Sequence, residues 1–429
     1  MLRAGAATVK IRLEDEYFPN AESVLKHDDV YVRAVIFEAG ERYAILEADM
    51  PSMFPPDVRY CKSLLKEIAG VENKRSWIAV SHSFSAPHTW PLDSEQKDTY
   101  RPKGLDDPKN AEIALKINQA YKDAYKEAIV GALADMREAR CGYSRGTCGI
   151  NVNRNMETAD GWWEGVNYDG YADHSLGVVR FVDKSGENIA VLYNYSMQVG
   201  VMAGAFPDLG GRVTSADVVG VASLYVENEL GGTCMFLCGA TGDQAPMFKC
   251  NYIEKDKDGH CRERNMGYEN SGILQSMGMA LGNAIMLTAQ GTEPEDINED
   301  IVSVQRSYIC RCQKRDNDMH KLHATHEYKY EVEGTRELTV DVMILGDIAM
   351  VGLLPELDGI TVAQIRDRSP YDKTIVSCFI NGNAKNMPQR DSYKLFYKAA
   401  MNSPFAEGSA EQTRDVAVGL LHDIKNNMC

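Results

Sequence analysis

The chain has 429 residues and a formal net charge of −16, with 44% hydrophobic and 25% charged residues. This balance is typical of a globular protein with a sizeable core and argues against disorder. Because an acidic surface repels phosphate backbones, we expect no nucleic-acid partner. The eleven cysteines show no repeated spacing, so we expect free thiols in a reducing, cytoplasmic compartment.

Membrane insertion is not expected either. The N-terminus has no apolar signal core. The most apolar long stretch, residues 340–355, contains Asp341 and Asp347 and is better explained as two buried strands. We therefore expect no integral membrane segment.

In chain order, pairs of β-prone runs around glycine-containing turns alternate with helical patterns. The paired runs predict β-hairpins over residues 31–47, 177–195 and 337–353. Helices are predicted over residues 56–68, 110–137, 216–230, 276–289, 354–367, 391–401 and 411–427. This alternation predicts an α/β fold with a mixed β-sheet core and flanking helices. No linker composition divides the chain, so we expect a single domain over residues 1–429.

Two polar stretches, residues 91–109 and 250–270, are expected to be surface loops. The second contains Cys250, Cys261 and His260, whose spacing fits no common zinc module. The thiols of Cys310 and Cys312 would point to one face of a strand. Free thiols are the favoured interpretation for all four cysteines.

Residues 77–88 form an apolar run followed by small polar residues that include His82, Phe84 and His88. The ends of strands are where α/β proteins build their sites. A histidine there could bind metal, although a hydrogen-bonded structural histidine is the more common outcome. The segment is therefore a candidate site only in combination with others.

Residues 237–246 form a second candidate, in which a buried strand opens into a glycine-rich loop that holds Asp243. Such loops let backbone N–H groups approach a ligand, but no Gly-Lys-Ser/Thr follows, so this is not a P-loop. A structural turn in which Asp243 caps backbone amides is at least as well supported.

Three more segments could contribute side chains. Gln198 and Glu356 follow the second and third predicted hairpins, and Arg154 lies among asparagines in residues 151–155. Glu356 could act as ligand, as base, or only as a favourable charge at a helix N-terminus. Arg154 could clamp an anion or form an ordinary ion pair. Trp162 and Trp163 could line a pocket mouth or simply pack.

The order of these motifs resembles the catalytic domain of the neutral/alkaline (non-lysosomal) ceramidase family. The family's Asn-Arg segment, its Ser-x-Asp-x-x-Gly helix start, its Gly-Asp-x-Ser-Pro loop and its Pro-Glu junction have counterparts in order. These are Asn153-Arg154, Ser215 to Gly220, Gly242 to Pro246, and Pro355-Glu356. We expect no counterpart of the C-terminal β-sandwich that larger members carry.

The resemblance also implies a site. In the family, zinc is held by two histidines, a glutamate and a tyrosine, which fall on His82, Gln198, Glu356 and Asn386. A catalytic histidine falls on Phe84 and a serine on Ala245, whereas the arginine and the last tyrosine are kept as Arg154 and Tyr397. Because zinc requires three or four good donors, we expect zinc to bind weakly or not at all.

The site prediction therefore has three parts. His82 and Glu356 are the candidate metal ligands. The candidate catalytic residues are Arg154, Tyr397, Asp243 and His88. The candidate substrate-binding residues are Phe84, Ala245, Gln198, Asn386, Trp162 and Trp163.

Three functional hypotheses follow. The first is a divergent ceramidase-like hydrolase that cleaves an amide or related bond of a small-molecule substrate. The second is a non-catalytic binding or regulatory protein on the same scaffold. The third is a metal-independent enzyme in which Glu356 or His82 is the base. A homo-oligomer is compatible with all three.

Overall fold

The largest sheet of the protein has eight strands. The computed structural model describes residues 1–92, 101–204, 212–267, 271–298, 301–315 and 321–428. In spatial order the strands are β12 (Thr233–Cys238), β10 (Asn188–Tyr195), β9 (Ser175–Asp183), β6 (Arg137–Thr147), β1 (Arg3–Lys10), β3 (Tyr31–Ala39), β4 (Glu41–Ala48) and β5 (Ser76–Val80). The pairs β10–β12 and β4–β5 are parallel and the others are antiparallel, so the sheet is mixed.

A second sheet of four strands packs face to face on the first. Its order is β16 (Val302–Gln313), β17 (Val332–Leu345), β18 (Ile348–Leu353) and β20 (Lys373–Ser377). One buried cluster joins the two inner faces, with Phe37 and Trp77 from the large sheet and Met343, Met350 and Ile375 from the small one. The two sheets therefore form a sandwich with an apolar interior.

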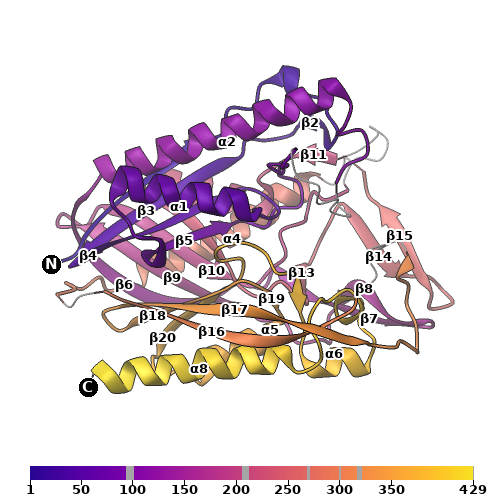
Figure 1. The fold of residues 1–429 in the computed structure, drawn as a ribbon. Helices are drawn as coiled ribbons and strands as arrows, with labels where there is room; N and C mark the ends of the chain where they lie inside the picture. The colour runs from indigo at the N-terminus through magenta and orange to yellow at the C-terminus, as the bar shows by residue number, and fades with distance from the viewer. Residues whose placement is uncertain (93–100, 205–211, 268–270, 299–300, 316–320, 429) are drawn as a thin grey trace.

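Helices cover both outer faces of this sandwich. The outer face of the large sheet is covered by α1 (Pro55–Ala69), α2 (Pro108–Ala134), α3 (Asp217–Leu230) and α4 (Gly272–Gln290). The outer face of the small sheet is covered by α5 (Gly359–Asp367) and α8 (Ser409–Met428). Figure 1 shows the resulting layers, with α1 and α2 above the sheets and α8 below them. The predicted α/β class, a mixed sheet core with flanking helices, is confirmed.

The sequence of β3 explains this layering. Val32, Ala34 and Ile36 face the helices, whereas Val35 and Phe37 face the second sheet. Side chains alternate along a strand, so a strand covered on both faces needs apolar residues at consecutive positions. The continuous apolar residues 34–37 of β3 are therefore explained by burial on both faces of the strand.

Local signals set the ends of the first two helices. The carboxylate of Asp107 caps α2 by accepting hydrogen bonds from the backbone N–H groups of Lys109 (3.0 Å) and Asn110 (3.4 Å). Helix α1 ends at Gly70, which has a φ of 67° that favours glycine. Helix α2 packs so closely on β1 that a Cβ atom at Gly5 would lie 2.3 Å from the carbonyl oxygen of Ala132.

All three predicted hairpins are confirmed, as β3–β4, β9–β10 and β17–β18. The helix predicted from residue 354 begins only at Gly359, because β19 (Glu356–Leu357) pairs with β21 (Asn386–Met387). The helix predicted over residues 391–401 is two shorter ones, α6 (Arg390–Lys394) and α7 (Lys398–Met401).

The prediction of a surface loop over residues 250–270 is wrong for most of its length. β14 (Asn251–Lys255) and β15 (Cys261–Asn265) form an antiparallel hairpin there, although its side chains are largely exposed. Of the other predicted loop, residues 93–100 lie outside the described part of the chain.

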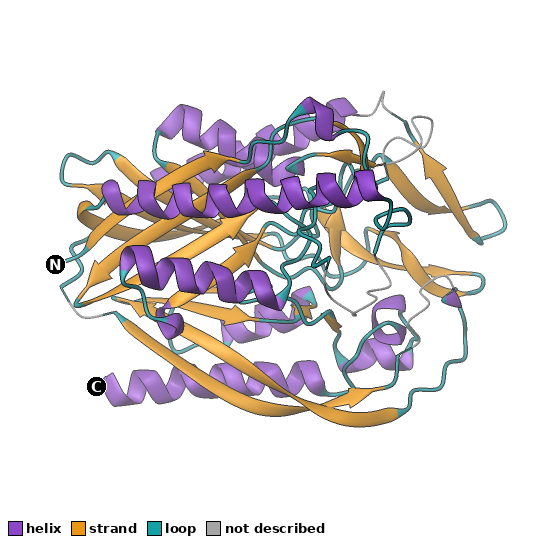
Figure 2. Ribbon diagram, turned by 45° about the horizontal axis from the view of Figure 1, so that its top comes forward, coloured by secondary structure: helices purple, strands orange, loops and turns teal. Residues whose placement is uncertain are grey.

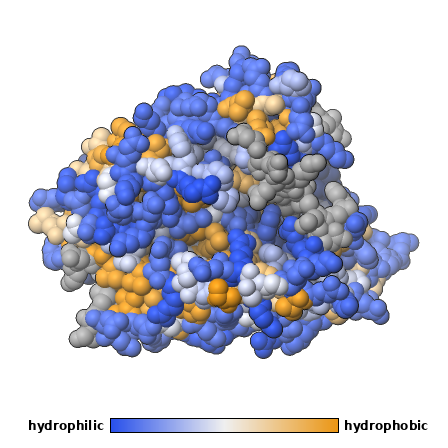
Figure 3. Space-filling view, viewed as in Figure 1, coloured by the Kyte–Doolittle hydropathy of each residue, from blue (hydrophilic) through white to orange (hydrophobic). Residues whose placement is uncertain are grey.

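The ten cysteines that the structure describes are all free thiols. Cys250 and Cys310 are buried, Cys312 is half-buried and Cys261 is exposed. Within the described residues, α4 is the one helix long and apolar enough to cross a membrane by length and composition. It packs against α3 and the large sheet, as core helices of the same composition also do. The face seen in Figure 1 is mostly hydrophilic, with hydrophobic residues in small groups (Figure 3).

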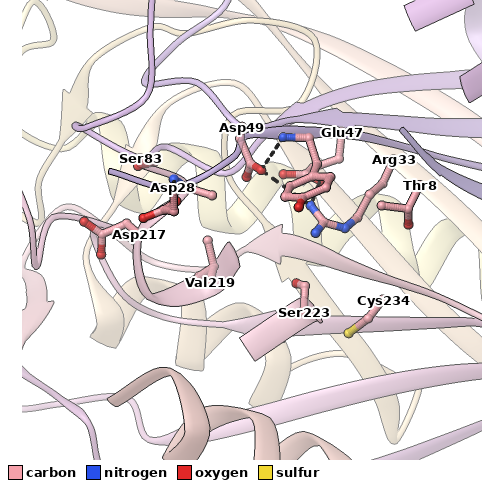
Figure 4. A network of polar contacts seen from close by, with 12 residues as sticks. Thr8, Asp28, Arg33, Glu47, Asp49, Ser83, Asp217, Val219, Ser223 and Cys234 are labelled. Carbon is pink, nitrogen blue, oxygen red and sulfur yellow. Dashed lines mark hydrogen bonds and ion pairs between the residues drawn. The ribbon is translucent and has the colours of Figure 1, made fainter. Parts of the chain in front are cut away.

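A buried ionic network lies between the large sheet and α3 (Figure 4). The Arg33 guanidinium lies 3.6 Å from carboxylate oxygens of both Glu47 and Asp49 and 3.2 Å from one of Glu227. Glu227 also accepts a hydrogen bond from the Thr8 hydroxyl at 2.7 Å. The single guanidinium of Arg33 is therefore the shared ion-pair partner of three buried or partly buried carboxylates.

The carboxyl ends of five strands, β5, β10, β12, β18 and β20, are joined by hydrogen bonds and lie close together. Strand ends of this kind are where α/β proteins usually place their sites. Loops of different lengths follow these five strands. Figure 2 shows these loops, in teal, gathered between the strand ends and the outlying strands. Among the outlying strands are β7 (Asn151–Thr158), β8 (Gly161–Asn167), β11 (Arg212–Thr214) and β13 (Gln244–Pro246).

Candidate functional site

A cavity of about 400 Å³ opens where these loops meet, a volume suited to a small ligand. Seven predicted site residues line it, and five of them come from five different segments. These five are His82 after β5, Arg154 on β7, Gln198 after β10, Glu356 on β19 and Asn386 on β21.

His82 is held in a single orientation at the cavity wall. Its ring N–H at Nδ1 donates to the carbonyl oxygen of Pro51 at 2.6 Å, which leaves the lone pair of the neutral ring on Nε2. Nε2 is buried and has no hydrogen-bond partner within the described part of the chain. Burial, opposed by the charge of Glu356, lowers the pKa of His82. The ring is therefore neutral at pH 7, with one basic nitrogen available.

Glu356 faces this nitrogen. Its Oε2 atom lies 3.7 Å from Nε2 of His82 and accepts a hydrogen bond from Nδ2 of Asn386 at 3.1 Å. Backbone pairing explains the second contact, because Glu356 and Asn386 are direct partners in the parallel β19–β21 ladder. The two residues of the pair thus reach the same point from different parts of the chain.

The backbone around the pair is unusual. His82 has a φ of 57° and Lys385, next to Asn386, a φ of 69°. Left-handed conformations are uncommon for residues other than glycine, and they cluster at functional sites.

Two phenylalanine rings enclose the His82 ring. Phe84 meets it edge-on, with centroids 4.7 Å apart, and Phe379 stacks on it at 4.0 Å. This apolar enclosure explains why burial dominates the pKa of His82.

Arg154 forms hydrogen bonds to three other segments around the cavity. Its Nε and Nη2 atoms donate to the carbonyl oxygen of Gly242 at 2.9 and 2.6 Å. Its Nη1 atom donates to Glu164 at 2.9 Å and to Oε1 of Gln198 at 3.2 Å. Most of its donors are therefore already used within the protein.

Among the other predicted residues, Phe84 and His88 also line the cavity. His88 is paired through Nδ1 with Glu22 at 2.6 Å, and its ring packs on that of Trp90. These contacts explain its orientation without a ligand.

Five predicted residues are not part of the cavity wall: Asp243, Ala245, Tyr397, Trp162 and Trp163. Asp243 instead accepts hydrogen bonds from the backbone N–H of Gly359 (2.7 Å) and the side chain of Asn153 (3.0 Å). This is the turn-stabilising alternative considered for the loop. Ala245 is fully buried in β13, and the Tyr397 ring packs on that of Trp162 at 4.9 Å.

Sequence reasoning missed several charged residues of the wall. These are Glu164, Arg212, Lys249, Lys385 and Lys398. None belongs to a recognisable motif, and their charge pattern emerges only when the segments are brought together. The one signal in the sequence was proximity, since Glu164 follows the tryptophan pair and Lys398 follows Tyr397.

The fold has known relatives among solved structures. A neutral ceramidase from Pseudomonas aeruginosa superposes with a TM-score of 0.72 over 99% of this chain and 75% of that one, at 14% identity. This chain has the fold of neutral ceramidase. A second structure, a ceramidase complexed with C2, gives a TM-score of 0.73 with the same identity and coverage. No family model matches the sequence, and no curated protein gives a significant match.

The donor atoms of this site do not fit a tightly held zinc ion. Within the described residues, no group of three or more His, Cys, Asp or Glu side chains could hold a metal. His82 and Glu356 are two strong donors, one fewer than zinc sites use. Oε1 of Gln198 already accepts from Arg154, and the amide nitrogen of Asn386 donates to Glu356. The neighbouring guanidinium would also repel a cation.

Proposed function

We propose that the protein is a hydrolase that cleaves an amide or related bond of a small molecule, with His82 as the base. One observation carries the proposal. Nε2 of His82 has no hydrogen-bond partner among the residues that the structure describes, faces the Glu356 carboxylate at 3.7 Å and belongs to a residue that lines the cavity. Two acceptors that face each other are suited to hold the two hydrogens of one water molecule.

The proposed reaction uses these two groups. The water oxygen bonds to the carbonyl carbon of the substrate while a water proton passes to Nε2 of His82. Glu356 stabilises the imidazolium through its negative charge, and the hydrogen bond to Pro51 keeps the ring oriented. The bond to the leaving group then breaks as the proton moves from Nε2 to the departing atom.

We further propose that zinc is held weakly or not at all, because only His82 and Glu356 offer strong donors. Elemental analysis of protein purified without chelator tests this directly. Near one equivalent of tightly held zinc that is lost on His82→Ala would overturn it.

The apolar enclosure of His82 favours a second candidate, a binding protein without catalysis. A base must carry a positive charge after it takes up the proton, and the rings of Phe84 and Phe379 do not solvate that charge. Only the Glu356 carboxylate opposes this cost. Turnover measurements separate the two candidates.

The experiment is a screen of N-acyl amides and carboxylic esters with the native protein, His82→Gln and Glu356→Gln. We expect His82→Gln to lower kcat/KM about 100-fold or more, as removal of a general base does. His260→Gln is the matched control, since His260 forms an ion pair with Asp160 outside the cavity. Undiminished activity of His82→Gln would refute the assigned base, and no turnover by the native protein would favour the binding protein.

A further inference from the structure

Among the described residues that line the cavity, positive charges outnumber negative ones, although the chain as a whole is strongly acidic. The cationic residues of the cavity wall are Arg154, Arg212, Lys249, Lys385 and Lys398. The acidic residues that the structure describes in this wall are Glu164 and Glu356. A positive excess inside a cavity of a protein with a net charge of −16 is a local arrangement that the overall composition does not explain.

Glu164 neutralises only part of this charge. Its two oxygens are shared between Nη1 of Arg154 at 2.9 Å and Nζ of Lys398 at 2.5 Å. The charges of these two cations lower the pKa of Glu164 to about 2, against the effect of burial. One carboxylate therefore balances two fixed cations, and a further positive charge beside them has no counterion.

That further charge is Lys249, which follows β13 and is half-buried in the wall. Its ammonium group makes no hydrogen bond or ion pair with any residue that the structure describes. Burial lowers its pKa to about 8, while the charge of Glu164 acts in the opposite direction. At pH 7 it is mostly protonated, with all three donors unused.

An unpaired ammonium in a cavity is costly unless a ligand compensates it. Lys249 also lies close enough to Arg154 and Lys398 for their charges to lower its pKa. An anion placed here would meet three cations, of which one is free to donate. Beside them the wall offers the apolar rings of Phe54, Phe84 and Trp90, which could pack on the uncharged part of a ligand.

We propose that Lys249, supported by Arg154 and Lys398, binds an oxyanion group of the substrate, such as a carboxylate, sulfate or phosphate. The inference rests on the proposed function and deepens it, because it makes the substrate a small organic anion rather than a neutral lipid. The negative group would be held by the lysines, and the bond to be cleaved would lie toward His82 and Glu356.

The test is calorimetric titration of the native protein, at low ionic strength, with inorganic phosphate, sulfate and acetate as separate probes. We expect saturable binding of at least one probe, and the preferred probe identifies the anionic group. Lys249→Met should weaken that binding at least tenfold, and Lys249→Arg should restore part of it. Lys66→Met is the matched control. Lys66 lies on α1 and forms an exposed ion pair with Glu72, so the substitution removes the same charge far from the cavity wall.

Two outcomes would overturn the inference: no saturable binding of any probe by the native protein, or equal binding by the native protein and folded Lys249→Met. If Lys249→Met does not fold, Lys249→Gln replaces it, since the amide keeps the site polar but removes the charge. The result of this test is independent of whether the proposed hydrolase activity exists. His82→Gln should bind the probe as the native protein does while losing turnover, so binding without turnover in the native protein refutes only the hydrolase.

Discussion

Nε2 of His82 lies 3.7 Å from Oε2 of Glu356, and the proton of the neutral imidazole is on the opposite nitrogen, bonded to Pro51. The charge of Glu356 favours the imidazolium, whereas burial among aromatic rings disfavours it more strongly. Several measurable properties follow from this pair and from the charges around it.

The first prediction concerns the pKa of His82. Glu356→Gln removes the negative charge that raises this pKa, so the pKa should fall further below its usual value. An NMR titration of the histidine ring protons measures the change. His260, which is paired with Asp160, should titrate as before in the same sample. An unchanged or higher pKa of His82 would show that the two groups do not interact in solution.

The second prediction concerns the pH dependence of stability. The folded-state pKa values of Asp49 and Asp217 are raised to about 6 from 3.8, mainly by burial. Their protonation therefore stabilises the fold fully below about pH 4, and this contribution is lost as the pH rises through about 6. Glu164, with its pKa lowered to about 2, acts in the opposite sense below pH 4.5.

The free energy of unfolding should accordingly be highest near pH 4 to 4.5 and decrease by roughly 1–3 kcal/mol as the pH rises to about 6.5. Urea denaturation at a series of pH values measures this. Asp49→Asn should flatten the decrease, because the amide does not titrate. A stability that rises steadily from pH 5 to 7.5 would contradict the assignment.

The third prediction concerns the buried network of Figure 4. Arg33→Met removes the one cation that serves Glu47, Asp49 and Glu227 and leaves buried carboxylates unpaired. Breaking a buried ion pair in this way costs about 3–5 kcal/mol. Arg12→Met, which removes an exposed partner of Glu127, should change the denaturation midpoint little. Equal effects of the two substitutions would show that Arg33 is not a structural ion.

The fourth prediction concerns zinc. Gln198→His with Asn386→Tyr would add a nitrogen and an ionisable oxygen beside His82 and Glu356, whose side chains line the same cavity. Competition with a chelator should show at least a 100-fold gain in zinc affinity, since a completed four-donor shell is worth many kcal/mol. A folded double variant that binds zinc no better than the native protein would refute the correspondence of one or both positions with the family's ligands.

The elements that the sequence predicts well are those with a strong local signal. The hairpin over residues 31–47 has two apolar runs around Gly40, and α2 has its cap at Asp107, so neither depends on distant residues. The start of α5 was misplaced because Glu356 pairs with Asn386, a contact between segments that local patterns do not record. The hairpin β14–β15 was missed because its side chains, mostly half-buried in β14 and exposed in β15, show no alternation.

The residues of the candidate site also fall into two groups, those that a local sequence pattern indicates and those that it does not. His82, Gln198 and Glu356 could be proposed because each follows a recognisable strand or hairpin. Lys249 could not, because its significance lies in what surrounds it. Lys249 has no counterion among the described residues. This becomes apparent only once Glu164, Arg154 and Lys398, which come from distant parts of the chain, are placed around it.

The two-residue ladder between β19 and β21 has an evolutionary consequence. Backbone hydrogen bonds hold position 386 beside the Glu356 carboxylate whatever side chain that position carries. A single codon change at this position can therefore replace the amide of Asn386 with the phenol of tyrosine, the imidazole of histidine or the carboxylate of aspartate. The new group would lie at the same place in the cavity. The chemistry of the site can thus change by one substitution while the backbone that surrounds it stays the same.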